Sequence, residues 1–288
     1  RDASLAVFID GNVVGAYAWG AYAPDEAVPV ASLSKAITAV CVAKLVDSGR
    51  LTFDSTLGEL LEPYLEQHPP TDPRADGITV RALVDHASGI TTDPSQGDGL
   101  QNFHPFSMDT AELQVTAALS HTLGEIGTFH YNNANYALLQ MIIEARTGDA
   151  YEDYCRRSVL DPVGAEGMLD PDWRVLGAYG GWRISAQDFA KVLRYFSPPK
   201  TLIGVPVSEW PRAKIGRGAY YSLGTVVESN RGHDRYWHYG ALSYDDPATS
   251  LAAYFAVWDN VGFVATFTPL VDNAAMNDLG ASLYLAVH

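Results

Sequence analysis

The chain has 288 residues, of which 47% are hydrophobic and 18% are charged, a composition typical of an ordered globular protein with a large core. Its formal net charge of −15 argues against nucleic acid or an anionic membrane surface as a partner. The longest apolar stretch, residues 36–46, contains Lys44 and is too short to span a bilayer, so we expect no membrane span.

The N-terminal region predicts a β-hairpin that leads into a helix. Residues 5–19 alternate well enough for two strands, with Asp10-Gly11-Asn12 as the turn. After an extended segment, apolar periodicity from Leu33 to Leu45 predicts a helix that stops at Gly49. Cys41 lies in the middle of this helix, so we expect a buried free thiol there.

The middle of the chain is predicted to be mainly helical and its C-terminal third mainly strand. Residues 91–110 form a long irregular stretch, a kind of segment that often carries function or moves. Helices are predicted over residues 51–65 (in short pieces), 79–86, 112–123, 135–147, 150–160, 185–196 and 272–287. Strands are predicted over residues 220–228, 235–238, 249–258 and 262–268.

Strands at both ends and helices between them predict an α+β fold, in which the terminal segments form one antiparallel sheet flanked by helices. We expect residues 1–55 and 178–288 to form one discontinuous sheet domain. Residues 56–177 would form an inserted helical domain, with the active site in the cleft between the two.

The predicted helix after the hairpin begins with the sequence Ser32-Leu33-Ser34-Lys35. Residues three apart on a helix share a face, so the Ser32 hydroxyl and the Lys35 ammonium can meet. Burial would lower the lysine pKa and give the hydroxyl a proton acceptor. The alternative is that Ser32 or Ser34 simply caps the helix. A second S-x-x-K, Ser197 to Lys200, contains two prolines that disfavour a helical turn.

Two further motifs follow in order, Tyr131-Asn132-Asn133 before the helix at 135–147 and His238-Tyr239-Gly240 in a strand. The order S-x-x-K, Y-x-N, H-x-G resembles the serine β-lactamase and penicillin-binding-protein superfamily. The resemblance is to its class C-like branch, which includes D,D-carboxypeptidases, D-aminopeptidases and β-lactamase-like carboxylesterases. Residues 83–90, Leu-Val-Asp-His-Ala-Ser-Gly-Ile, are also similar to a segment of that family, and the resemblance covers most of the chain.

The resemblance implies a role for each matching residue. Ser32 would be the acyl-accepting nucleophile, Lys35 would share its proton, and Tyr131 would be the general base, its phenolate favoured by nearby cations. Asn133 would bond to Lys35 and to the substrate carbonyl. The third motif would add His238 and Gly240 to the substrate wall, and the backbone N–H groups of Ser32 and Ala241 would form the oxyanion hole. No cofactor and no metal are implied.

Each residue also has a structural interpretation. Tyr131 could serve packing alone, Asn133 could be a helix N-cap, and His238 could be a packed strand histidine. His86 matches a family position that looks structural, so it is left out of the site. The chain lacks a G-x-S-x-G elbow, a phosphate-binding glycine loop and a zinc motif.

The substrate is expected to be a small ester, D-peptide or lactam. Where many β-lactamases of this branch carry a lysine, this chain has His238, which at neutral pH would be only partly charged. We therefore expect a carboxylesterase or a D,D-peptidase-like enzyme acting on small esters or D-amino-acyl amides. The alternatives are a class C-like β-lactamase, or a non-catalytic sensor of penicillin or peptidoglycan. The start at Arg1 rather than Met slightly favours a periplasmic or secreted protein.

Overall fold

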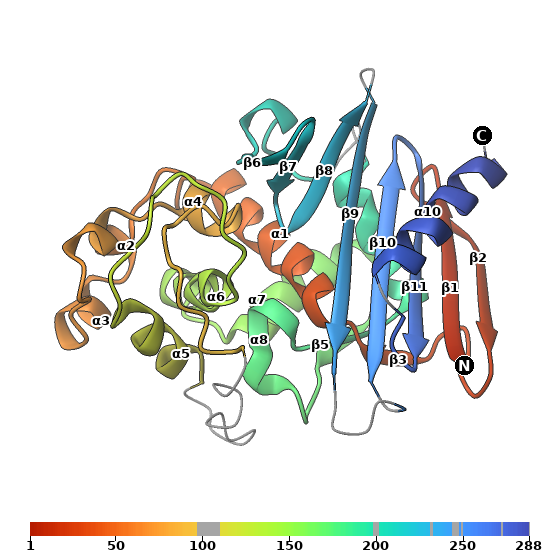
Figure 1. The fold of residues 1–288 in the computed structure, drawn as a ribbon, viewed down its shortest axis with the longest axis horizontal. Helices are drawn as coiled ribbons and strands as arrows, with labels where there is room; N and C mark the ends of the chain where they lie inside the picture. The colour runs from red at the N-terminus through yellow and green to blue at the C-terminus, as the bar shows by residue number, and fades with distance from the viewer. Residues whose placement is uncertain are drawn as a thin grey trace.

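The computed structural model describes residues 1–96, 110–197, 202–230, 233–243, 248, 250–271 and 273–287. Its centre is an eight-stranded antiparallel sheet in the order β2-β1-β11-β10-β9-β8-β7-β6 (Figure 1). The strands are β1 (Asp2–Ile9), β2 (Asn12–Trp19), β6 (Ala213–Gly216), β7 (Ala219–Ser222), β8 (Thr225–Asn230), β9 (His233–Leu242), β10 (Leu251–Trp258) and β11 (Val261–Thr268). This architecture confirms the predicted α+β class.

The first strand joins the two ends of the chain, as predicted. The hairpin turns at Asp10 and Gly11, both at positive φ (51° and 85°), the conformation that matches the twist of paired strands. On its other side β1 pairs with β11, with Ala6 opposite Val264. The N-terminal hairpin and the C-terminal strands therefore form one sheet.

Helices cover both faces of the sheet. Helix α10 (Asn273–Val287) packs on one face through Met276, against Tyr254 and Phe263. Phe255, which follows Tyr254 on β10, belongs to the main core on the opposite face of the sheet. On that face α9 (Ala186–Val192) lies against β1 and β11. Ser185 caps α9 by accepting a hydrogen bond from the Asp188 backbone N–H.

The remaining helices lie on one side of the sheet, on the left in Figure 1. They are α1 (Ser34–Asp47), α2 (Leu57–Leu60), α3 (Glu62–Gln67), α4 (Val80–Val84), α5 (Thr110–Leu119), α6 (Ala134–Thr147), α7 (Tyr151–Cys155) and α8 (Gly177–Gly180). The division into a sheet domain and an inserted helical domain stays a prediction. Most of the loop predicted over residues 91–110 lies outside the described residues.

Two predictions about strands are wrong. The run at 220–228 is not one strand but two, β7 and β8, because Leu223 and Gly224 turn the chain at φ 45° and 73°. A second sheet of three short strands was missed, in the order β3 (Ala27–Pro29), β5 (Trp182–Ser185) and β4 (Gly167–Leu169). Strands of three or four residues are too short for an alternation to be recognised.

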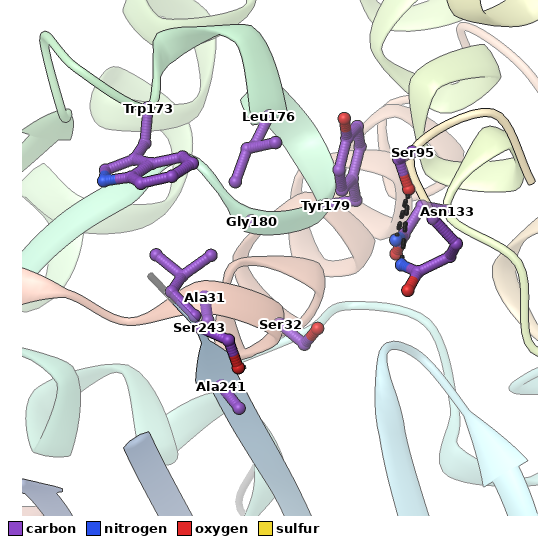
Figure 2. A pocket seen from close by; sticks show the side chains of 12 residues that line it. Ala31, Ser32, Ser95, Asn133, Trp173, Leu176, Tyr179, Gly180, Ala241 and Ser243 are labelled. Carbon is purple, nitrogen blue, oxygen red and sulfur yellow. Dashed lines mark hydrogen bonds between the residues drawn. The ribbon is translucent and has the colours of Figure 1, made fainter. Parts of the chain in front are cut away.

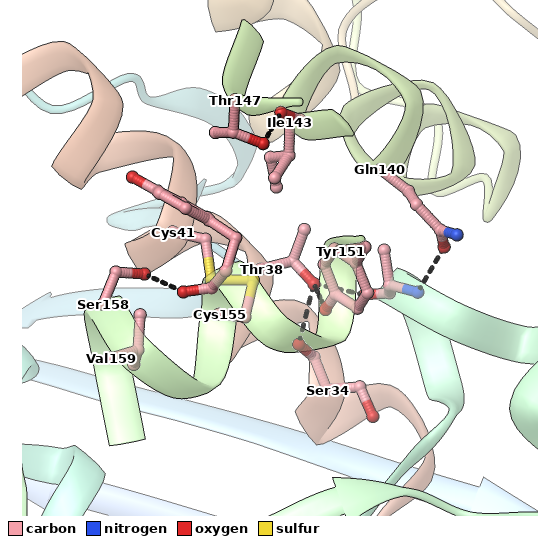
Figure 3. Close-up of a disulfide and its surroundings, with 12 residues drawn as sticks. Ser34, Thr38, Cys41, Gln140, Ile143, Thr147, Tyr151, Cys155, Ser158 and Val159 are labelled. Carbon is pink, nitrogen blue, oxygen red and sulfur yellow. Dashed lines mark hydrogen bonds between the residues drawn. A yellow bond between two sulfur atoms is a disulfide. The ribbon is translucent and has the colours of Figure 1, made fainter. Parts of the chain in front are cut away.

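The predicted free thiol at Cys41 is also wrong. Cys41 of α1 and Cys155 of α7 form a buried disulfide, with their Cα atoms 5.6 Å apart (Figure 3). The two residues are 114 positions apart, so their pairing depends on the packing of α1 against α7, which the sequence pattern does not encode. The disulfide thus anchors the helix that follows Ser32.

The described part of the chain shows neither a membrane-spanning helix nor a cluster of metal-binding side chains. None of its helices is long and apolar enough to cross a bilayer. No group of three or more His, Cys, Asp and Glu side chains there is placed to hold a metal ion.

Candidate active site

Ser32 lies in a tight turn at the start of the nucleophile helix. Residues 31–33 form one turn of 3-10 helix, and α1 itself begins at Ser34. Ala31, immediately before Ser32, has a positive φ of 49°, a conformation that costs a non-glycine residue energy and is concentrated at functional sites. No side chain caps either helix start, and the Ser34 hydroxyl accepts a hydrogen bond from the Trp182 backbone instead. The capping interpretation of Ser32 and Ser34 is therefore wrong.

Lys35 is fully buried and its ammonium nitrogen faces Ser32. Its Nζ lies 3.2 Å from Ser32 Oγ and 2.8 Å from the backbone oxygen of Tyr179. Burial lowers the pKa of Lys35 to about 7, an effect that the negative charge of Asp93 partly opposes. A substantial fraction of this side chain is therefore a neutral amine at neutral pH, able to accept a proton.

Tyr131 completes a three-residue group with Ser32 and Lys35. Lys35 Nζ lies 4.9 Å from the centre of the Tyr131 ring. Removal from water raises the pKa of Tyr131, although a hydrogen bond with Ser32 acts in the opposite direction. The expectation that nearby cations favour a phenolate is wrong, because desolvation is the largest influence on the Tyr131 pKa and the charge of Asp93 also raises it. In the resting site Tyr131 is a phenol that can donate a proton, it lines the cavity beside Ser32, and 38% of its surface is exposed.

Asn133 contacts different partners from those expected. Its Nδ2 donates to Ser95 Oγ at 2.8 Å, and its backbone N–H donates to Asp93 Oδ2 at 2.9 Å. Within the part of the chain that the structure describes, Lys35 donates instead to Ser32 Oγ and to the backbone oxygen of Tyr179. Asn133 occupies the N-cap position of α6, as the structural interpretation expected, but its side chain makes no capping hydrogen bond.

His238 is buried in β9 and its imidazole is neutral. Nδ1 lies 2.7 Å from the backbone oxygen of Tyr239, so Nδ1 must carry the proton. Nε2 then accepts from the Tyr221 hydroxyl at 3.1 Å. Burial, and secondarily the charge of Lys35, lower the pKa of His238 to about 3. The expected partial positive charge at neutral pH is therefore wrong.

Gly240 allows β9 to approach the Ser32 turn. A Cβ atom at this position would lie 2.6 Å from the Val30 backbone oxygen and 3.0 Å from the Ser32 backbone nitrogen. Real Cβ atoms do not tolerate such contacts, so a side chain here would push the strand away. The next residue, Ala241, lines both cavities beside Ser32, consistent with the expected pair of oxyanion donors.

Two cavities meet at Ser32 and Ala241. The first, here called the polar cavity (Figure 2), has a volume of about 230 Å³; its lining residues are Ala31, Ser32, Ser95, Gln96, Asn133, Trp173, Leu176, Tyr179, Gly180, Ala241, Leu242 and Ser243. The second, the aromatic cavity, has a volume of about 340 Å³; it is lined by Ser32, Phe129, Tyr131, Tyr221, Val226, Trp237, His238, Tyr239 and Ala241. Within the described residues, neither lining contains a Lys, Arg, Asp or Glu side chain.

Sequence reasoning missed the residues that support this site. Asp93 and Ser95 lie in the irregular loop, Trp173 and Tyr179 precede β5, and Tyr221 lies on β7. The unusual length of the loop was the only signal for the first two, and the packed aromatic residues carried none.

Three other residues that match or imitate family motifs are His86, Lys214 and Lys200. The His86 ring packs against the Tyr131 ring in a tilted arrangement, with ring centres 4.4 Å apart, and His86 accepts a hydrogen bond from the Asn132 backbone, which fits a supporting role. A K-x-G sequence, Lys214-Ile215-Gly216, also occurs in the chain, but it lies on the edge strand β6, three positions from β9 in the sheet. Lys200 of the second S-x-x-K lies outside the described residues.

A model of the Beta-lactamase family matches residues 1–283. The chain belongs to the β-lactamase family. This match confirms the resemblance that the three ordered motifs indicated. Family membership covers the whole core described here, so the cleft around Ser32 can be compared with those of its relatives.

Solved structures of low sequence identity share this fold. A D-stereospecific amidohydrolase from Streptomyces sp. superimposes with a TM-score of 0.75 at 17% identity, covering 93% of this chain and 89% of that chain. A D-amino acid amidase from Ochrobactrum anthropi SV3 gives a TM-score of 0.69 at 16% identity, covering 92% of this chain and 86% of that chain.

Among curated relatives, Penicillin-binding protein 4 of Amycolatopsis lactamdurans is 28% identical over 174 residues, or 56% of this chain and 42% of that protein. Protein flp of Staphylococcus aureus (strain N315) is 29% identical over 140 residues, or 49% of this chain and 27% of that protein. The chain therefore matches less than half of the length of these two relatives.

Proposed function

We propose that this chain is a serine hydrolase that forms an acyl-enzyme at Ser32 and acts on small uncharged esters or D-aminoacyl amides. The observation that carries the proposal is the buried Lys35, with Nζ 3.2 Å from Ser32 Oγ and a pKa lowered to about 7. A hydroxyl paired with a neutral amine has a proton acceptor at physiological pH. The relatives named as an amidohydrolase and an amidase add support, since those names describe hydrolysis of amides.

In the proposed acylation, Ser32 Oγ attacks the substrate carbonyl carbon while its proton passes to the neutral amine of Lys35. The carbonyl electron pair moves to oxygen, where the backbone N–H groups of Ser32 and Ala241 stabilise the charge. Tyr131 then donates its phenolic proton to the departing oxygen or nitrogen as that bond breaks, and Lys35 returns a proton to Tyr131. Deacylation follows the same steps in reverse, with water in place of the leaving group. Water attacks the acyl carbon and gives its proton to Tyr131, Tyr131 passes a proton to Lys35, and Lys35 protonates Ser32 Oγ as the acid leaves.

The wall of the cleft favours uncharged substrates over β-lactams. A β-lactam antibiotic carries a carboxylate, and a lysine at the third motif would give it a permanent cation. Here His238 is neutral, because burial lowers its pKa to about 3. The described lining residues of both cavities supply no other cation. The β-lactamase alternative thus lacks a binding partner for the substrate charge, while the sensor alternative does not explain an intact Ser32, Lys35 and Tyr131.

Covalent labelling tests the proposal directly. A fluorophosphonate should add its mass to Ser32, and Ser32→Ala should abolish both labelling and turnover of a panel of phenyl esters, D-alanyl amides and nitrocefin. Ser34→Ala is the matched control, because within the described residues the hydrogen bond of that hydroxyl is one accepted from the Trp182 backbone. Labelling at Ser34, or nitrocefin turned over far faster than every ester and amide, would contradict the proposal.

The disulfide supports a location for this activity. Cys41 and Cys155 are paired, and structural disulfides persist mainly in oxidising compartments. We therefore propose that the enzyme works in the periplasm or outside the cell.

A further inference from the structure

Helix α8 carries the carbonyl group that Lys35 contacts, and its own sequence gives it little rigidity. Three of the five residues 177–181 are glycines, the residue type with the greatest backbone freedom. The backbone oxygen of Tyr179, in this segment, accepts a hydrogen bond from Lys35 Nζ at 2.8 Å. The same nitrogen lies 3.2 Å from Ser32 Oγ, so the position of α8 helps to determine where the amine meets the nucleophile.

A series of buried side chains ends on the carbonyl group next to that of Tyr179. Trp182 Nε1 is 2.8 Å from the Tyr151 hydroxyl, and that hydroxyl is 2.7 Å from Thr38 Oγ1. Thr38 Oγ1 is in turn 2.6 Å from the backbone oxygen of Ala178. These four residues are at most 1% exposed, so their polar groups depend on one another and not on solvent.

The series has one possible direction. An indole N–H can only donate, and a carbonyl oxygen can only accept. Thr38 has a single hydroxyl proton, which must point to the Ala178 oxygen at 2.6 Å, so its contact of 3.1 Å with the Ser34 oxygen is secondary. Tyr151 therefore donates to Thr38 and accepts from Trp182. Removing one hydroxyl would leave buried neighbours without a partner, which is costly, and would release the Ala178 carbonyl.

The series also joins α7 to α1 beside the disulfide. Thr38 lies one turn before Cys41 on α1, and Tyr151 lies one turn before Cys155 on α7. The pair of hydroxyls and the disulfide are thus two neighbouring links between the same two helices (Figure 3). Because the disulfide keeps α7 docked, a variant that lacks one hydroxyl can fold and still lose the hold on α8.

We propose that Tyr151 and Thr38 are positioning residues for the reaction, which hold α8 so that the Tyr179 carbonyl keeps the Lys35 amine facing Ser32. This inference rests on the proposed function, since it takes Lys35 as the proton acceptor. Tyr151 and Thr38 line neither the polar nor the aromatic cavity, so they act through Lys35 and not on the substrate. Loss of either hydroxyl should therefore lower kcat and leave KM nearly unchanged.

Two variants remove a hydroxyl and nearly keep the shape of the side chain, Thr38→Val and Tyr151→Phe. We expect each to lower kcat for the phenyl ester of N-acetylglycine by about tenfold or more, because displacing a reacting group by about 1 Å can cost about 10²-fold. KM should stay within about threefold of the wild-type value. Each kcat is divided by the fraction of protein that a fluorophosphonate has labelled at Ser32 at the end of the reaction, so unfolded molecules are not counted.

Two further variants are controls. Thr38→Ser loses a buried methyl group but keeps the hydroxyl, so its kcat for each labelled site should stay within about threefold of wild type. Tyr195→Phe removes another buried hydroxyl, one that donates to the Val159 backbone oxygen at 3.0 Å outside this series, and should keep the wild-type kcat. A residue that served stability alone would not change kcat for each labelled site. An unchanged kcat in Thr38→Val or Tyr151→Phe, or an equal loss in Thr38→Ser or Tyr195→Phe, overturns the inference.

The labelling step separates this inference from the proposed function. If the wild type takes no label at Ser32 and hydrolyses no ester, the proposed function fails, and this inference with it. If the wild type is labelled and active while both hydroxyl variants keep its kcat, the serine hydrolase stands and only the positioning role of Tyr151 and Thr38 fails.

Discussion

Replacing Lys35 by methionine should change the pH dependence of stability in a predictable direction. In the unfolded chain the lysine has its ordinary pKa of 10.5, whereas in the folded protein burial lowers it to about 7. Between these values the unfolded state binds more protons at this residue, so the contribution of Lys35 to the free energy of unfolding rises with pH above about 7. At 1.36 kcal/mol for each pKa step, this contribution rises by about 2–3 kcal/mol between pH 6 and pH 9.

Lys35→Met keeps the shape of the side chain but has no proton to release, so this rise should be missing from its stability profile. Urea unfolding at pH 6, 7.5 and 9, followed by tryptophan fluorescence, measures the effect as a difference between variant and wild type. That difference should become less favourable to the variant by about 2–3 kcal/mol across the range, whatever its value at pH 6. Lys214→Met, at an exposed lysine on β6, is the control. Parallel profiles for Lys35→Met and wild type would refute a neutral buried amine.

Three more predictions follow from the same geometry. Tyr131→Phe should lower kcat by about 10²–10⁴-fold with little change in KM, and a loss within threefold would remove Tyr131 from proton transfer. For the phenyl ester of N-acetylglycine, kcat/KM should rise with pH through an apparent pKa of about 7, as Lys35 loses its proton. No second inflection should occur between pH 5 and 9, because His238 stays neutral there. An inflection that disappears in His238→Gln would contradict this. The double variant Cys41→Ala and Cys155→Ala should lose about 2–5 kcal/mol of unfolding free energy, and a reductant should destabilise the wild type but not this variant.

Local patterns in the sequence predicted the main architecture well. The hairpin at 5–19 follows from alternation and a turn that needs positive φ, and α6 follows from helical periodicity that ends at Gly148 with φ 75°. Each of these two predictions depends on residues that lie close together in the sequence. The three-stranded sheet and the Cys41–Cys155 disulfide depend on segments far apart in the chain, and no local pattern encodes them.

The sequence predicted which residues lie together at the site, but it did not predict their protonation states. Motif order placed Ser32, Lys35, Tyr131 and His238 in one cleft, and the structure brings them together there. Burial then decides their protonation, since it lowers the pKa values of Lys35 and His238 and raises that of Tyr131. The degree of burial is a property of the packed fold and cannot be read from a short motif. The charge predicted for His238 from the sequence was therefore wrong.

The neutral imidazole of His238 on the cleft wall and the neutral amine of Lys35 depend on each other. Lys35 Nζ lies close enough to His238 for its charge to lower the histidine pKa, and the same coupling acts in return. A cation at position 238 would depress the pKa of Lys35 further, while an acidic side chain in either cavity would raise it and block proton acceptance. A cleft lined by uncharged groups therefore suits a lysine that must lose its proton near pH 7.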